Sequence, residues 1–102
     1  MDIETIRAKV RAKHYLVYDH AITEAFKDGL SVKDMLHVLF NGNIVEDYPE
    51  RSRCLIYGNL ADGIPVHVVV DYARFEFEIV TAYIPDNREW IGFKVRRPQL
   101  HR

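Results

Sequence analysis

This sequence of 102 residues lacks the features that define several common protein classes. Its one cysteine, Cys54, has no partner for an internal disulfide and cannot build a thiolate metal site alone, so we expect it to be a small buried apolar side chain. The longest apolar runs, such as 68–70, fall far short of the roughly 20 residues that cross a bilayer. We therefore expect neither a disulfide framework nor a membrane span.

The first residues do not resemble a secretory signal peptide. Asp2 and Glu4 stand where a signal peptide has basic residues, and no long apolar region follows them. This pattern predicts a cytoplasmic protein.

The motifs of the commonest enzyme classes are also missing. There is no glycine-rich phosphate loop, no HExxH pair and no nucleophile elbow, which argues against the usual NTPases, dehydrogenases, zinc proteases and hydrolases. The five histidines, at positions 14, 20, 37, 67 and 101, form no i, i+4 pair on a predicted helix. We therefore expect no metal site and no cofactor.

Composition and charge are those of an ordinary folded domain. Hydrophobic residues make up 48% of the chain and charged residues 28%, and the length suits a single domain over residues 1–102. The net charge of −1 argues against strong nonspecific binding of nucleic acid by the whole molecule. Basic residues gather in 94–102, where there is no acid, so this segment either attracts an anionic ligand or is a solvated tail.

Helical periodicity dominates the first 41 residues. It predicts a helix at about 3–13 capped by Asp2, a second with Asp19 as its N-cap that ends at Asp28-Gly29, and a third that runs from about 32 to 41. Ser31 with Asp34 resembles a capping box for the third helix. Residues 15–18 favour a connector or a brief edge strand. The second helix is expected to bury four apolar side chains, those of Ala21, Ile22, Ala25 and Phe26.

The period changes to that of strands from Ile44 onward. Four strands are predicted at about 43–48, 53–60, 65–72 and 75–84, and their short connections require antiparallel pairing. The segment 65–72 is apolar on both alternations, which is typical of a central strand covered on both faces. The predicted fold class is therefore α+β, with about three N-terminal helices packed on a four-stranded antiparallel sheet.

One face of this sheet is a candidate reaction site. Cleavage of RNA through its own 2′-hydroxyl needs a base, an acid and a cation, which His, Tyr and Arg side chains supply without a metal. Strand alternation places several such side chains on the same face: Arg53, Tyr57, His67, Thr81 and Tyr83.

Structural roles for the same residues remain open. From the residues alone, a buried histidine hydrogen-bonded across the sheet is the favoured interpretation of His67, ahead of a catalytic role, and Tyr83 is also explained as a packed aromatic. Trp90 either closes a core or stacks on a base. Arginines such as Arg51 and Arg53 commonly pair with neighbouring acids.

Short sequence blocks carry a resemblance to a known family. The chain resembles an uncharacterised bacterial domain of unknown function that looks related to the RelE and BrnT toxins and is often encoded beside MqsA-type zinc-ribbon antitoxins. The blocks are Asp19-His20-Ala21, Asp28-Gly29-Leu30-Ser31, Val45-Glu46-Asp47-Tyr48-Pro49, Arg53-Cys54-Leu55, Pro65-Val66-His67-Val68-Val69 and Thr81-Ala82-Tyr83-Ile84-Pro85, with Trp90. Glu24 departs from the pattern, because the commoner form has arginine there, and Lys27-Asp28 replaces a frequent Glu-Arg pair.

The resemblance implies a RelE-like toxin fold, with helices on one sheet face and RNA on the other. It implies the toxin of a type II toxin–antitoxin system, a metal-independent endoribonuclease that cleaves mRNA, often on the ribosome, and is silenced by an antitoxin protein encoded nearby. The expected catalytic residues are His67 as general acid or base, Arg53 as phosphate ligand, Tyr83 as proton donor and His20 as a second acid or base. The expected RNA-binding residues are Arg51, Lys94, Arg96 and Arg97.

A noncatalytic protein- or RNA-binding module of the same fold, including a degenerate toxin, is the alternative. The nuclease requires the His, Arg and Tyr side chains to cluster on an open, positively charged face. The module should bury those side chains or pair them with acids, and should expose an apolar patch.

Overall fold

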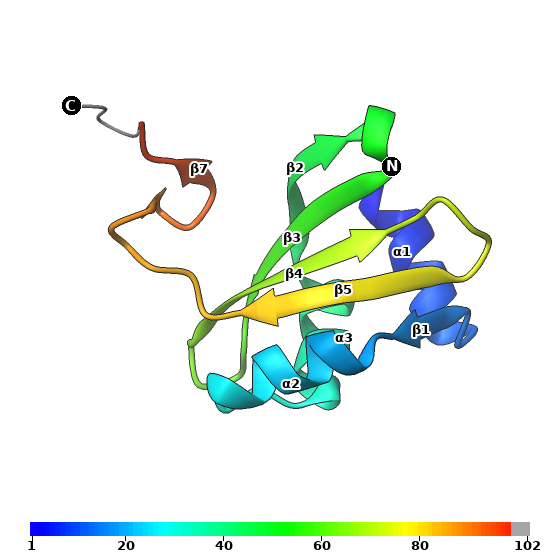
Figure 1. The fold of residues 1–102 in the computed structure, drawn as a ribbon, viewed down its shortest axis with the longest axis horizontal. Coiled ribbons are helices and arrows are strands. Elements are labelled where there is room, and N and C mark those ends of the chain that lie inside the picture. Colours follow the sequence, from blue (N-terminus) through cyan, green and yellow to red (C-terminus); the bar gives the residue numbers. More distant parts are fainter. Residues whose placement is uncertain (99–102) are drawn as a thin grey trace.

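The computed structural model describes residues 1–98, which form helices in the first part of the chain and strands in the rest (Figure 1). The helices are α1 (Ile3–Arg11), α2 (Asp19–Lys27) and α3 (Val32–Asn41), with a short 3-10 turn, η1 (Pro49–Arg51). The strands are β1 (Tyr15–Val17), β2 (Asn43–Tyr48), β3 (Arg53–Asn59), β4 (Pro65–Asp71), β5 (Phe77–Tyr83), β6 (Trp90–Ile91) and β7 (Val95–Arg96).

The main sheet has five strands in the order β1-β5-β4-β3-β2, and β6 with β7 forms a separate two-stranded sheet. Strands β2 to β5 are antiparallel neighbours and match the four predicted strands, with β4 in the centre. The prediction of a four-stranded, wholly antiparallel sheet is nevertheless wrong, because β1 pairs in parallel with β5 and makes the sheet mixed. Local periodicity does not report this pairing, which joins Tyr15 to Phe77.

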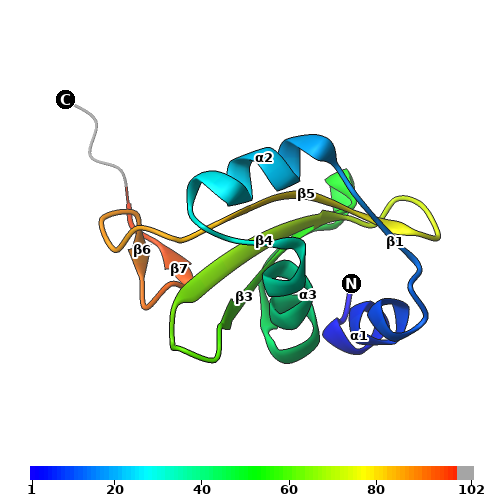
Figure 2. The ribbon, with the colours of Figure 1, turned by 90° about the horizontal axis from the view of Figure 1, so that it is seen from below.

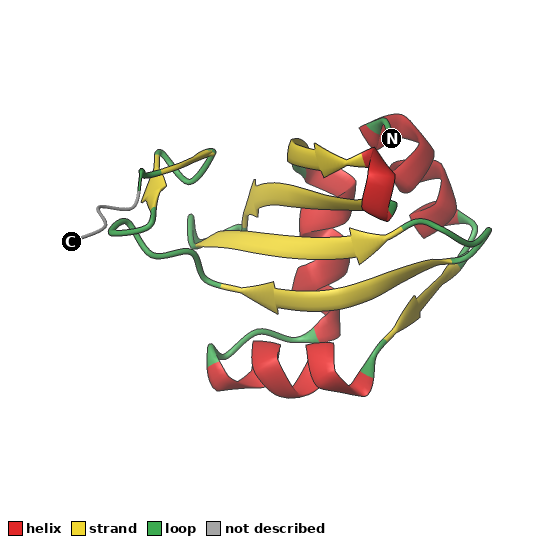
Figure 3. Cartoon of the chain, turned by 45° about the horizontal axis from the view of Figure 1, so that its top comes forward, coloured by secondary structure: helices red, strands yellow, loops and turns green. Residues whose placement is uncertain are grey.

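The three helices leave one face of the main sheet free of helix. Figure 3 shows α3 crossing behind the strands while α2 lies beside β5. The core lies between the helices and this sheet face, and it includes Ile6, Ala21, Ala25, Met35, Val38, Leu39, Ile56, Val68, Val70, Phe77 and Ile79. We call the opposite face the open face. Figure 2 shows the β6–β7 hairpin at the end of the sheet where β4 begins and β5 ends.

Helix ends follow the predicted capping residues with one exception. The Asp2 carboxylate accepts from Thr5 N at 2.8 Å, and Ser31 with Asp34 forms both bonds of a capping box. The helix α2 is preceded by Tyr18, so the prediction of Asp19 as its N-cap is wrong. Asp19 is instead the first helical residue, where its negative charge still suits the helix dipole.

Two apolar side chains of α2 are not where the helical pattern predicts. Ala21 and Ala25 are fully buried, but Ile22 and Phe26 point away from the core and are exposed. Phe75 is likewise exposed, because β5 begins only at Phe77 and not at residue 75. Among residues 1–98, no helix is long and apolar enough to span a membrane.

A short C-terminal hairpin, not predicted from the sequence, follows β5. Gly92 and Phe93 both have positive φ, at 57° and 63°, and Lys94 N donates to Ile91 O across the turn. Two successive left-handed residues give the turn type that matches the twist of a hairpin. Such a φ is strained for a bulky residue, so the contacts of Phe93 must offset that strain.

Candidate functional site

Three ring side chains form a row across the open face. His67 on β4 lies directly opposite Tyr57 on β3 and Tyr83 on β5, and residues paired in this way point to the same face. The ring centroids are 5.9 Å apart for Tyr57 and His67 and 5.3 Å apart for His67 and Tyr83. We call these three residues the aromatic row.

Both ring nitrogens of His67 are hydrogen-bonded. Nε2 lies 2.7 Å from the carbonyl oxygen of Phe93, so Nε2 carries the proton and donates. Nδ1 therefore accepts, and the Tyr83 hydroxyl donates to it at 3.2 Å. Burial lowers the pKa of His67 and raises that of Tyr83, so His67 is held as a neutral imidazole beside an un-ionised phenol.

The β6–β7 hairpin lies over the aromatic row. The rings of the buried Trp90 and of His67 meet in a T-shaped contact with their centroids 4.4 Å apart, and the ring centroids of Phe93 and Tyr57 are 6.0 Å apart. Arg96 stacks on Trp90 with its guanidinium carbon 4.5 Å from the ring centroid, and its Nε lies 3.0 Å from the Glu46 carboxylate on β2. The hairpin is thus bonded to both the centre and the edge of the sheet, and His67 has no exposed surface.

Next to the hairpin the open face holds a small pocket of about 160 Å³, which we call the arginine pocket. Three arginines and one acidic residue are among the residues that line it. Arg53 lies 3.4 Å from Asp71 and stays half-exposed, while Arg51 makes no salt bridge within residues 1–98. The lining residues are Glu46, Tyr48, Arg51, Arg53, Cys54, Leu55, Val69 and Arg96.

The remaining expected site residues lie elsewhere. His20 is exposed on the first turn of α2 and belongs to neither the aromatic row nor the arginine pocket. Lys94 lines a separate polar pocket with Asn41, Asn43 and Asn59. Arg97 donates to the carbonyl oxygen of Asn87 at 2.7 Å, and Arg102 of the basic segment lies outside the described residues.

Sequence reasoning missed two partners that define this site. The carbonyl of Phe93 fixes the protonation of His67, and Glu46 neutralises Arg96. Only the glycine before Phe93 hints at a turn, and nothing in the sequence indicates where that turn packs. Within residues 1–98, no group of three or more His, Cys, Asp or Glu side chains is arranged to hold a metal ion.

Comparison with known proteins identifies a family and little more. The family model described as a domain of unknown function (DUF4258) matches residues 17–84, two thirds of the chain, so the chain belongs to that family. No curated protein and no solved structure matches. The match ends before the β6–β7 hairpin, so the segment that covers the aromatic row lies outside it.

Proposed function

We propose that this member of the family is a noncatalytic RNA-binding module whose arginine pocket holds phosphate groups of a single-stranded RNA. The observation that carries the proposal is the gathering of Arg51, Arg53 and Arg96 around one pocket on the sheet face that the helices leave open. Arginine presents a planar set of donors that matches phosphate oxygens.

The size and wall of the pocket support a phosphate group as ligand. A volume of about 160 Å³ is well below the roughly 300 to 1,000 Å³ of sites for drug-sized ligands. Tyr48, exposed at the pocket, offers a ring on which a neighbouring base can stack. Glu46 and Asp71 each offset one arginine, so we expect moderate affinity with few phosphate contacts.

The state of His67 supports a noncatalytic role. A general acid or base must reach the proton that it transfers, within about 3.2 Å or through one water. Both nitrogens of His67 are already bonded, and the ring is buried under Trp90 and Phe93. In this arrangement no RNA hydroxyl can approach it.

Fluorescence anisotropy with a labelled single-stranded RNA tests the binding proposal. Arg51→Gln and Arg53→Gln should each weaken binding several-fold, whereas Lys33→Gln, on the exposed surface of α3, should not. A plot of the logarithm of the association constant against the logarithm of the salt concentration should have a slope near −1 to −2. About two phosphate contacts to a single strand give a slope of this size. Equal effects of all three substitutions would contradict a site at this pocket.

The second candidate is the endoribonuclease toxin of a type II toxin–antitoxin system, a single RelE/BrnT-like toxin domain. The shared face of His67, Tyr83 and Arg53 favours it, since these supply an acid or base, a proton donor and a phosphate ligand. It requires the β6–β7 hairpin to lift from His67. In this reading the protein acts on mRNA in the cytoplasm, on or off the ribosome, and an antitoxin encoded nearby silences it.

Incubation of the protein with RNA in EDTA separates the two candidates. A nuclease of this type leaves 2′,3′-cyclic phosphate ends, and His67→Ala should abolish them. Intact RNA, together with no growth arrest when the chain is expressed without its neighbouring gene, is the result expected for the binding module.

A further inference from the structure

Helix α2 carries an exposed apolar stripe. Ile22 and Phe26 lie four residues apart on one side of the helix. Tyr18, the extended residue just before the helix, continues the spacing of four, and its hydroxyl donates to the Glu78 carboxylate on β5. Tyr18 and Ile22 are each 43% exposed, and Phe26 is 79% exposed. In an isolated chain these exposed side chains contribute no hydrophobic stabilisation. Their spacing along the helix is nevertheless typical of a helix whose apolar side packs against a partner.

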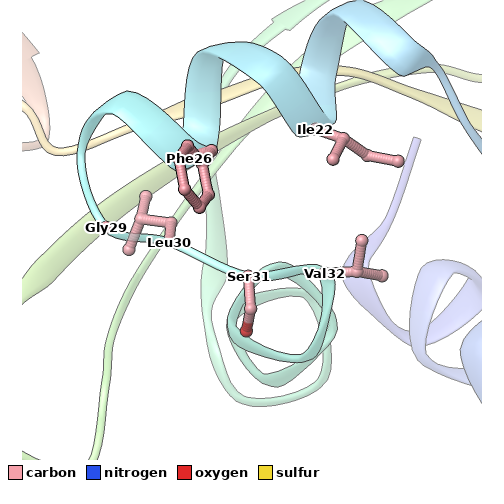
Figure 4. Close-up of a pocket in the computed structure, with 6 residues that line it drawn as sticks. All are labelled: Ile22, Phe26, Gly29, Leu30, Ser31 and Val32. Carbon is pink, nitrogen blue, oxygen red and sulfur yellow. The ribbon is translucent and has the colours of Figure 1, made fainter.

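A groove lies along this stripe, between α2 and the start of α3. Its volume is about 380 Å³, and its lining is mostly apolar. Figure 4 shows Ile22 and Phe26 projecting from α2 on the side where Val32 lies, with Leu30 and Ser31 on the segment that joins the two helices. The stripe and the groove together make one continuous apolar surface, and such surfaces mark sites of protein association.

Phe26 differs from the other strongly exposed phenylalanine. The ring of Phe75, 68% exposed, lies 4.9 Å from the Lys9 ammonium and 4.8 Å from the His14 ring. Within residues 1–98, Phe26 has no ring or cation partner of this kind. Phe75 therefore already has partners within the chain, and it serves as a matched control for Phe26.

The charges beside the stripe are self-complementary. Asp19 lies in the first turn of α2 and Lys27 in the last, and helical spacing puts both on the side of the stripe away from Ala21 and Ala25. When two antiparallel helices pack stripe to stripe, these flanks meet, and each Asp19 lies near Lys27 of the other copy. The Lys27 ammonium now contacts Glu24 at 3.0 Å on the exposed surface, a pair that costs little to exchange.

We propose that a second copy of this chain binds the stripe and groove, giving a two-fold dimer with antiparallel α2 helices. The pattern is centred near Ile22, so the same surface serves both copies, as a two-fold interface requires. With the two-fold axis near Ile22, Phe26 of each copy lies level with Tyr18 of the other and packs on its apolar stripe. The dimer leaves the arginine pocket open, because that pocket lies on the opposite sheet face.

Sedimentation equilibrium of the full chain tests this dimer. The average mass should rise from that of one chain toward that of two chains as the protein concentration rises from about 5 to about 500 μM. This is the range over which a dimer with a dissociation constant in the micromolar range forms. Phe26→Glu should remain one chain throughout, and Phe75→Glu should behave as the original sequence does. Since both side chains are exposed, both variants should keep the far-ultraviolet circular dichroism of the fold.

A charge exchange tests the antiparallel arrangement. Asp19→Lys and Lys27→Glu should each weaken self-association about three-fold or more through like-charge repulsion. Their equimolar mixture should restore it, because in the mixed dimer every lysine faces an acid. The dimer would be overturned if the original sequence had the mass of one chain at every concentration, or if Phe26→Glu still dimerised. The antiparallel arrangement would be overturned if the mixture of the two charge variants did not restore self-association.

Discussion

The carbonyl oxygen of Phe93 accepts a hydrogen bond of 2.7 Å from Nε2 of His67, 26 residues earlier in the chain. This single bond joins a strained turn residue to the central strand of the main sheet. It also settles which nitrogen carries the proton, and so makes the Tyr83 hydroxyl a donor to Nδ1. Two predictions about the His67 imidazole and one about the close contact at Gly42 can be tested by unfolding measurements, and a fourth, about Cys54, by thiol chemistry.

Loss of the imidazole should destabilise the protein strongly. His67→Ala removes a buried ring and leaves the Phe93 carbonyl and the Tyr83 hydroxyl without their partner, so the free energy of unfolding should fall by about 3 kcal/mol. Tyr83→Phe removes only one hydroxyl and should cost about 1 kcal/mol. Urea denaturation measures both. A His67→Ala loss no larger than that of Tyr83→Phe would contradict the structural role.

Stability should fall as the pH falls below neutrality. Burial, the largest effect, lowers the pKa of native His67 below 6.5, and Arg96 acts in the same direction while the Phe93 carbonyl and Glu46 oppose it. Between the two pKa values the unfolded chain binds more protons, so stability is present above about pH 6.5 and is lost progressively below it. Urea midpoints between pH 7.5 and 5 measure this. The change of unfolding free energy with pH should be smaller in His67→Ala than in the original sequence. An equal pH dependence in the two proteins would assign the effect to other groups.

The Cys54 thiol should be unreactive in the folded protein. It is buried on the core side of β3, and burial raises its pKa to about 12, so almost no thiolate exists at neutral pH. A thiol reagent such as DTNB should label the native protein very slowly and the protein in denaturant at once. Rapid native labelling would show that β3 opens readily.

Gly42 should not tolerate a side chain, for a purely steric reason. A Cβ there would lie 2.4 Å from the carbonyl oxygen of Tyr57 and 2.6 Å from that of Val38, while its φ of −89° is open to any residue. Gly42→Ala should therefore cost about 2 kcal/mol or more. Gly63→Ala, where φ is +88° and no atom lies nearby, should cost about 1 kcal/mol from backbone strain alone. Thermal or urea unfolding would compare the two, and an equal cost would contradict the close contact.

The sequence predicts most of the local structure, because local signals are written in neighbouring residues. The Asp2 cap, the capping box of Ser31 and the positions of β2 to β5 all follow from spacing within a few residues. The parallel pairing of β1 and the exposure of Phe26 depend on how distant elements pack. Helical spacing shows that Phe26 belongs to an apolar stripe, but not whether that stripe packs within the chain.

The candidate site divides in the same way. Strand alternation places Tyr57, His67 and Tyr83 on one face, and the register bears this out. Alternation does not reveal that a later hairpin covers them, because a turn of two residues fixes its own shape and not its docking site. The pairing of Arg96 with Glu46 is hidden for the same reason, since 50 residues separate them.

The pairing of Tyr15 with Phe77 has a consequence for how the chain is made. The two residues are 62 positions apart, 77 minus 15, and a ribosome adding about 5 to 20 residues per second needs roughly 3 to 12 s to cover that interval. During this time β1 exists in the nascent chain without its neighbour in the sheet. The first strand to be synthesised is therefore among the last to join the sheet, and a nascent chain stalled before β5 presents an unpaired edge to the cell.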